Sequence, residues 1–184
     1  MMDEAPARSP SWGRPGCILA CAAAALGVLY AAVSAYWGAG GTALLDTVGG
    51  TLERDARAHS AGLSVLVWTT VALKLVAGGV GLLAVALPQG PSPRQRRVVR
   101  GAAWLAAAVL VLYGGVLTLV GLLVQADIVH AAPHADHRAL RWHAFLWDPW
   151  FLVWGLLLAT ALTRTRRPAA DRLRRRGEPS HAHT

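Results

Sequence analysis

Lys74 is the only lysine in this chain of 184 residues, and it lies in the middle of a long apolar run. An ionisable side chain near the centre of a bilayer costs roughly 2.5 to 3.5 kcal/mol on insertion scales, so we expect it to face other helices or a wet cavity. Two interpretations stay open. Lys74 either serves a substrate, ion or proton site, or is a structural group bonded to nearby hydroxyls and carbonyls.

Several polar groups could share a site with Lys74. No acid lies in the core of another apolar run, and the acids nearest in depth lie close to the ends of the runs. We expect Lys74 to point into the helix bundle and to reach toward tyrosine or aspartate groups in one half of the membrane. The candidate intramembrane site comprises Lys74, Tyr113, Asp46, Asp127 and Asp148.

Histidines gather in the segment 125–148, together with aspartates. The spacing His-x3-His-x2-His would place ligands on one face of a helix, but Pro133 argues against a regular helix there. Imidazole and carboxylate groups can bind zinc or copper, although this spacing matches no strong zinc signature. The alternative is a set of polar loop histidines. The metal-site candidates are His130, His134, His137 and His143.

Other chemistry is poorly represented. Cys17 and Cys21, the two cysteines, lie four residues apart in the first apolar run, where they suit helix packing and make a poor metal site by themselves. Haem would need axial histidines inside the apolar runs, and every histidine lies outside them. Nucleophile elbows, P-loops, HExxH motifs and paired catalytic carboxylates are missing. The sequence therefore predicts no cofactor and does not favour an enzyme.

Four apolar runs must position these groups. The chain is 54% hydrophobic and only 15% charged, which is far from the composition of soluble domains. A helix of about 20 residues crosses roughly 30 Å of hydrocarbon, and a small soluble domain cannot bury four helices that are apolar all round. The expected spans are residues 16–37, 62–87, 101–124 and 145–163. The predicted fold class is all-α, a compact bundle of four transmembrane helices.

Arginines distinguish the two sides of the membrane. Thirteen of them precede the first span, separate spans two and three, or follow span four, whereas the other two loops hold Arg54, Arg57, Arg138 and Arg141. The positive-inside rule predicts that both termini and the middle loop face the cytoplasm. This distribution also accounts for the net charge of +8 without a nucleic-acid partner.

The two ends of the chain are polar. Residues 1–15 and 164–184 are expected to be disordered tails, and the arginine-rich second tail is expected to contact anionic lipids. A signal-peptidase site at Val33-Ser34-Ala35 would remove the first span. The run continues through Tyr36 and Trp37, however, as an interfacial anchor would, so we expect the span to be retained in a multi-pass protein of the cell membrane.

Aromatic and small residues complete the pattern. Tyr36 and Trp37 close the first span, and the fourth opens with Trp147, Asp148, Pro149 and Trp150. We expect Asp148 to cap that helix, with Pro149 in its first turn and the tryptophans at the membrane interface. Small residues recur at helical spacing along each span, which predicts that these faces meet in a tight bundle.

Four stretches of the sequence carry a family resemblance: Tyr36–Gly41, Asp46–Gly50, Lys74 within its span, and Trp147–Leu152. In these the chain resembles a bacterial domain-of-unknown-function family, three-nine-nine-five, over about residues 16–163. The resemblance implies a protein of similar size with four spans and this set of motifs. It implies no substrate, cofactor or catalytic residue.

Three functional hypotheses remain. The first is a small non-enzymatic membrane protein with a structural, regulatory or partner-binding role, acting with a membrane-protein partner or as a homo-oligomer. The second is a small transporter or channel-like protein that uses Lys74 and the acids in the outer half of the membrane. The third is a metal-binding membrane protein or an enzyme built on the histidine-bearing loop.

Overall fold

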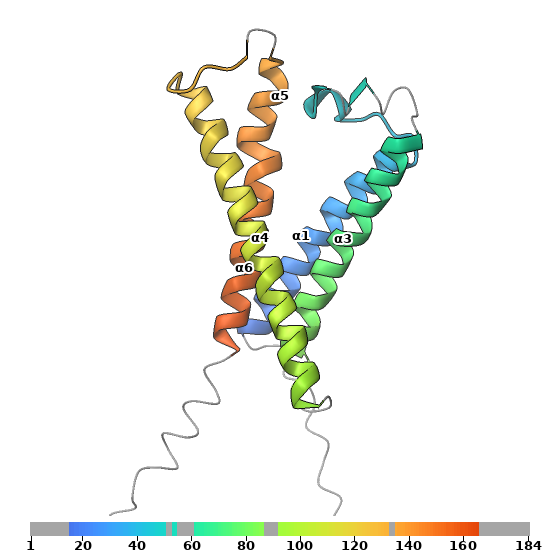
Figure 1. The fold of residues 1–184 in the computed structure, drawn as a ribbon, viewed down its shortest axis with the longest axis vertical. Coiled ribbons are helices and arrows are strands. Elements are labelled where there is room, and N and C mark those ends of the chain that lie inside the picture. Colours follow the sequence, from blue (N-terminus) through green and yellow to red (C-terminus); the bar gives the residue numbers. More distant parts are fainter. Residues whose placement is uncertain (1–14, 51–52, 55–60, 87–91, 133–134, 166–184) are drawn as a thin grey trace, which may run out of the picture.

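The computed structural model describes residues 15–50, 53–54, 61–86, 92–132 and 135–165 (Figure 1). No strand occurs among them, which confirms the all-α fold class. The long helices are α1 (Pro15–Gly38), α3 (Ala61–Ala86), α4 (Pro93–Gln125) and α6 (Asp148–Arg164). The short elements are η1 (Leu45–Thr47), α5 (His137–Trp142) and the π-helical turn η2 (His143–Trp147).

Four helical stretches are long and apolar enough to cross a membrane, as expected. Their mean hydropathies lie between 1.5 and 2.5. The fourth stretch is longer than α6 because α5 and η2 continue directly into it. Most of the two predicted tails, residues 1–14 and 166–184, lies outside the described residues, whereas Pro15 belongs to α1 and Arg164 to α6. The four stretches are Pro15–Gly38, Ser64–Ala86, Pro93–Gln125 and His137–Arg164.

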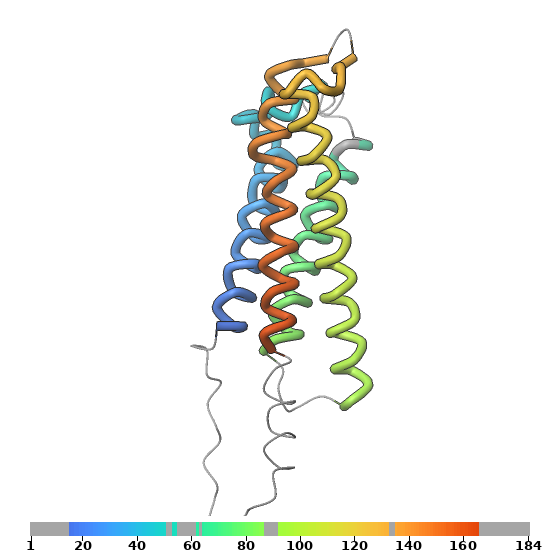
Figure 2. The backbone as a smooth tube through the Cα atoms, turned by 90° about the vertical axis from the view of Figure 1, so that its left-hand side faces the viewer, coloured from blue at the N-terminus to red at the C-terminus, as the bar shows by residue number. Residues whose placement is uncertain are grey.

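The helices form two antiparallel pairs, α1 with α3 and α4 with α6, and the pairs meet chiefly through α1 and α6. Figure 1 shows the pairs close together at one end and diverging toward the other, and both views show α1 and α6 side by side where the pairs are close (Figure 2). We call the end that contains the starts of α1 and α4 the arginine end. The opposite end, with residues 39–50 and 126–147, is the aromatic end.

The core of the bundle lies toward the arginine end and is built around Trp154, whose side chain is only 1% exposed. Alanines on α1 and α4 leave room for this indole, and a Cβ added to Gly27 would lie 2.6 Å from its ring. Small residues therefore mark the faces where helices approach closely, as expected. The core residues are Ala23, Ala103, Ala107, Leu110, Trp154, Leu158 and Leu162.

The four helices are not equally enclosed. In the most apolar parts of the first and fourth stretches, 39% of residues are buried, against 17% in the second and third. Large apolar side chains on α3 and α4 are correspondingly exposed, among them Val65, Leu73, Leu105 and Leu112. The inner pair α1–α6 thus holds the bundle together, and α3 and α4 form its periphery.

Helix α4 begins at Pro93, before the expected start of the span at residue 101. Ser92 caps it: its hydroxyl accepts a hydrogen bond from the backbone N–H of Gln95, and the Gln95 side chain accepts one from the backbone N–H of Ser92. With proline at the first helical position, this capping box nucleates the helix outside the apolar run. The arginines of the predicted middle loop therefore lie on the first turns of α4.

The start of the fourth span differs from the prediction that Asp148 caps a new helix. Asp148 has helical dihedral angles and follows η2 without a break. The backbone N–H of Asp148 donates to the carbonyl of His143, five residues earlier, as in a π-helical turn. Pro149 has no N–H to donate, and the wider turn before it accommodates this loss. The Asp148 side chain is therefore free to bond with His143 instead of a helix terminus.

Candidate functional site

Lys74 points from α3 toward α1. Its Nζ donates a hydrogen bond of 2.6 Å to the hydroxyl of Ser34, which is 5% exposed, and lies 4.1 Å from the centre of the Tyr30 ring. Ser34 and Tyr30 are one helical turn apart, so they share one face of α1. An ammonium above an aromatic face is attracted by the ring quadrupole. The described partners of Lys74 are thus a hydroxyl and a π-system rather than a carboxylate.

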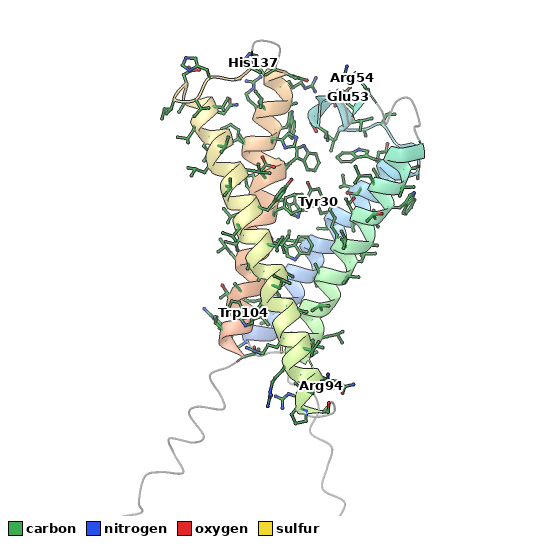
Figure 3. All side chains as sticks on the ribbon, in the orientation of Figure 1. Tyr30, Glu53, Arg54, Arg94, Trp104 and His137 are labelled. Carbon is green, nitrogen blue, oxygen red and sulfur yellow. The ribbon has the colours of Figure 1, made fainter. Side chains whose placement is uncertain are left out.

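Tyr30 is the centre of an aromatic cluster, which we define as Tyr30, Trp147, Trp150, Phe151 and Tyr113. The rings of Trp147, Trp150 and Phe151 lie with their centroids 5.8, 5.4 and 4.8 Å from that of Tyr30. Phe151 in turn meets Tyr113 of α4 edge to face at 5.2 Å. Figure 3 shows Tyr30 between the two diverging helix pairs.

Together with Lys74, this cluster forms a continuous layer of contacts across all four long helices. It runs from Tyr113 on α4 through Phe151 on α6 to Tyr30 on α1, and ends at Lys74 on α3. The indole N–H of Trp150 also donates to the carbonyl of Leu26 on α1, at 3.2 Å. Stacked and edge-to-face aromatic pairs add roughly 0.5 to 1.5 kcal/mol each beyond their buried area. The layer therefore couples the helix pairs where they begin to separate.

Residues 39–50 close the aromatic end above this layer, and we call them the cap. Thr47 is fully buried: its hydroxyl accepts from the indole N–H of Trp147 at 3.1 Å and donates to the carbonyl of Leu44 at 2.6 Å. The indole N–H of Trp37 donates to the carbonyl of Ala43 at 2.8 Å. Gly49 has a φ of 65°, and a Cβ there would lie 2.6 Å from that of Ala139. Only glycine both adopts this positive φ without strain and leaves room for the Ala139 side chain.

His143 links the cap to the start of α6. Its Nδ1 lies 3.3 Å from a carboxylate oxygen of Asp148, and its Nε2 lies 3.3 Å from the carbonyl oxygen of Val48. Asp148 is 6% exposed. A protonated imidazole would donate to both oxygens, and a neutral one to a single oxygen. His143 thus spans two segments that are far apart in the sequence.

Asp46 pairs with Arg138 of α5 at 2.8 Å, and both side chains are substantially exposed. An exposed pair of this kind contributes about 0 to 1 kcal/mol. Its effect is therefore mainly to orient the cap against α5. Asp136 caps α5 by accepting hydrogen bonds from the backbone N–H groups of Arg138 and Ala139, at 2.9 and 3.2 Å.

The predicted intramembrane site is divided among separate contacts. Lys74 binds α1, Asp46 binds α5, and Asp148 binds His143. Tyr113 is 54% exposed and reaches Lys74 only through Phe151 and Tyr30. Asp127 is exposed in the turn after α4, with a φ of 55°. The structure brings none of the three acids to the lysine.

The histidines are also dispersed. His130 and His137 are exposed, His143 belongs to the cap contacts, and His134 lies outside the described residues. Among the side chains that the structure describes, no three histidine, cysteine, aspartate or glutamate residues lie close enough to hold a metal ion. The metal site built on these histidines therefore stays a prediction, because His134 lies outside the described part of the chain.

Sequence reasoning did not identify Tyr30 and Ser34 as the partners of Lys74. Helical phase could have done so, because both lie on the small-residue face of α1 with Gly27 and Ala31. Thr47 and its bond with Trp147 were missed altogether. These two residues are separated by 100 positions, and no local pattern pairs them.

Comparison with known proteins gives one match. The profile of a protein family described as "Protein of unknown function (DUF3995)" matches residues 27–158. That range contains Lys74 and its partners, the aromatic cluster and the cap. No curated protein and no solved structure matches the chain.

Proposed function

The chain belongs to the DUF3995 family of proteins of unknown function, and we propose that it is a small non-enzymatic membrane protein with a structural or regulatory role exerted on a membrane-protein partner. Four apolar helices support a multi-pass membrane protein. We further propose that the membrane is the bacterial cell membrane, with both termini in the cytoplasm, because the arginines gather on the connections and tails of one side.

The proposal rests on the contacts that three polar side chains make within the chain. Lys74 joins α3 to α1, Asp46 joins the cap to α5, and His143 joins the cap to Asp148. These three groups, which could have served transport or catalysis, instead hold segments of the same chain together. A scaffold of fixed shape suits binding to another protein better than it suits a cycle of alternating access.

The partner is tested by co-expression with the membrane proteins encoded beside the gene. The complex is extracted in mild detergent, and its mass is measured by light scattering after size-exclusion chromatography. We expect one defined stoichiometry, which persists in the variant Lys74→Met because Lys74 acts within the chain. A protein that remains monomeric with every such candidate, and that conducts a solute when reconstituted alone, would overturn the proposal.

One observation favours a second function, a small transporter. The described partners of Lys74 are uncharged, so a permeating anion would meet a cation with no carboxylate beside it. The test is efflux of chloride, acetate or phosphate from proteoliposomes containing the purified protein. Transport requires efflux above that of empty liposomes and its loss in Lys74→Met. Efflux that is absent, or that is unchanged by the substitution, removes this function.

A further inference from the structure

A groove of about 280 Å³ opens at the arginine end between the last turns of α3 and the first turns of α4. One side is basic, with Arg96, Arg97 and Arg100. The other is apolar, with Leu83 and Ala84 of α3. Ligand sites of proteins usually enclose about 300 to 1,000 Å³, so this volume suits a compact polar group rather than a whole lipid or a large cofactor.

The arginines of the groove differ in what they bind. Arg100 is anchored to α6, where its guanidinium donates to the carbonyl of Leu162 and, at 3.3 Å, to the hydroxyl of Thr165. Arg96 and Arg97 are exposed, and within the described part of the chain neither forms an ion pair with an acid. Two guanidinium groups are thus available at the rim, beside a third that is held in place.

These charges lie where the helix itself disfavours them. Arg94, Arg96 and Arg97 occupy the first two turns of α4, and the amino end of a helix carries partial positive charge. Cations there lower the stability of the helix slightly, whereas an anion bound between Arg96 and Arg97 would be favoured by these two charges and by the helix dipole. The charge pattern is therefore better explained by an anionic ligand than by the needs of the fold.

The position of the groove along the membrane normal indicates which kind of molecule carries the anion. Leu83 and Ala84 lie in the last turn of the second apolar stretch, and Leu83 is 48% exposed. Val99 continues the apolar lining on α4, shortly before the core residue Ala103. The groove thus lies at the level where phospholipid head groups meet hydrocarbon, with an apolar wall that leads into the bilayer. Basic pockets between transmembrane helices at this level typically bind the head groups of anionic lipids.

We propose that this groove is a binding site for one anionic phospholipid. The phosphate lies between Arg96 and Arg97 and is reached by charge-assisted hydrogen bonds. The acyl chains follow the exposed side of α3 past Leu83. The site is formed by the folded bundle and is distinct from nonspecific attraction of lipid to the basic tail. Free phosphate would use the same arginines but would gain nothing from the apolar wall.

The test uses the full chain, purified in detergent, and counts bound lipid by native mass spectrometry. Phosphatidylglycerol and phosphatidylcholine with identical acyl chains are added separately. We expect one tightly retained phosphatidylglycerol, and at least about tenfold weaker retention in the double variant Arg96→Gln, Arg97→Gln, since each loses charge-assisted bonds. Arg94→Gln is the matched control. Arg94 is exposed on the same helix, does not line the groove, and lies at the tip of α4 in Figure 3.

Two further arms make the result decisive. The variant Arg96→Lys, Arg97→Lys keeps the charge and is expected to recover part of the retention, while circular dichroism verifies that all variants are equally helical. Inorganic phosphate, added as competitor, is expected to displace the lipid only at far higher concentration. Equal loss in Arg94→Gln, equal retention of phosphatidylcholine, or displacement by phosphate at concentrations similar to those of the lipid would each overturn the proposal.

Discussion

The ammonium of Lys74 rests between a serine hydroxyl and a tyrosine ring, both on α1. The two halves of this contact are not equivalent. Lysine brings a charge that must be solvated by protein in the membrane, whereas Ser34 can bond to a carbonyl of its own helix when the lysine is gone. The energetic cost of breaking the contact therefore depends on which partner is removed.

This asymmetry gives a prediction for single variants. Ser34→Ala leaves the ammonium without its hydrogen-bond acceptor and is expected to lower the free energy of unfolding by about 1 to 3 kcal/mol. Lys74→Met keeps the length of the side chain without the charge and is expected to change it by less than about 1 kcal/mol. Unfolding by denaturant in mixed micelles measures both. If Lys74→Met proves the more damaging change, Lys74 has a role that its described contacts do not explain.

A second prediction concerns Thr47, which is buried beside Trp147. Thr47→Val preserves shape but leaves the Trp147 indole N–H and the Leu44 carbonyl without their described partner. We expect a loss of about 1 to 3 kcal/mol and faster amide hydrogen exchange in residues 39–50, with little change in α4. Thr69→Val is the control, because the Thr69 hydroxyl bonds only within its exposed helix turn. Equal exchange in both variants would mean that Thr47 does not hold the cap.

At the scale of elements, the contact between α4 and α6 depends on glycine. A Cβ on Gly155 would lie 2.8 Å from both the backbone nitrogen and the Cγ2 of Val111, so the crossing leaves no room for a side chain at position 155. The core tryptophan and leucines of α6 pack on either side of this crossing. By contrast, a Cβ on Gly79 of α3 would meet nothing within 4 Å.

Substituting these two glycines by alanine should therefore have opposite effects. Gly155→Ala forces α4 and α6 apart and is expected to cost about 1 to 3 kcal/mol. Gly79→Ala encounters no obstacle and is expected to stabilise the chain by about 0.4 to 1 kcal/mol, because alanine restricts the unfolded chain. The two variants are compared by measuring the thermal unfolding midpoint of each in detergent. Destabilisation by both would indicate that the outer face of α3 is covered by another molecule.

At the scale of the whole molecule, the bundle consists of two helix pairs coupled through α1 and α6. Its ends differ in chemistry. The arginine end carries the basic groove, and the aromatic end carries the cap with its buried hydrogen bonds. A molecule with such different ends has a preferred orientation in a membrane, and the positive-inside rule states which one.

The orientation can be measured by cysteine labelling. In a chain with Cys17 and Cys21 replaced by alanine, the exposed positions Ser92 and His130 are changed to cysteine one at a time. A maleimide that cannot cross membranes should label His130→Cys in intact cells and Ser92→Cys only after lysis. The reverse result would mean that the arginines lie outside and that the proposed topology is inverted.

Much of this architecture follows from the sequence alone. Four apolar runs, each long enough to cross a bilayer, specify helices because lipid leaves the backbone no other partner. The faces of small residues follow from helical spacing, and the depth of Lys74 from its position along its span. These are properties of single segments, and they do not depend on how the segments meet.

Only the tertiary structure decided which residues of different segments contact one another. Lys74 finds Ser34 rather than an acid, Thr47 finds Trp147 across 100 positions, and His143 meets the carbonyl of Val48 across 95 positions. Each outcome depends on the rotation of the helices about their axes and on the path of the cap, which are set by the packing of all four helices together. Spacing within one segment specifies a helix face, but which atoms meet across helices is determined only when the faces are packed.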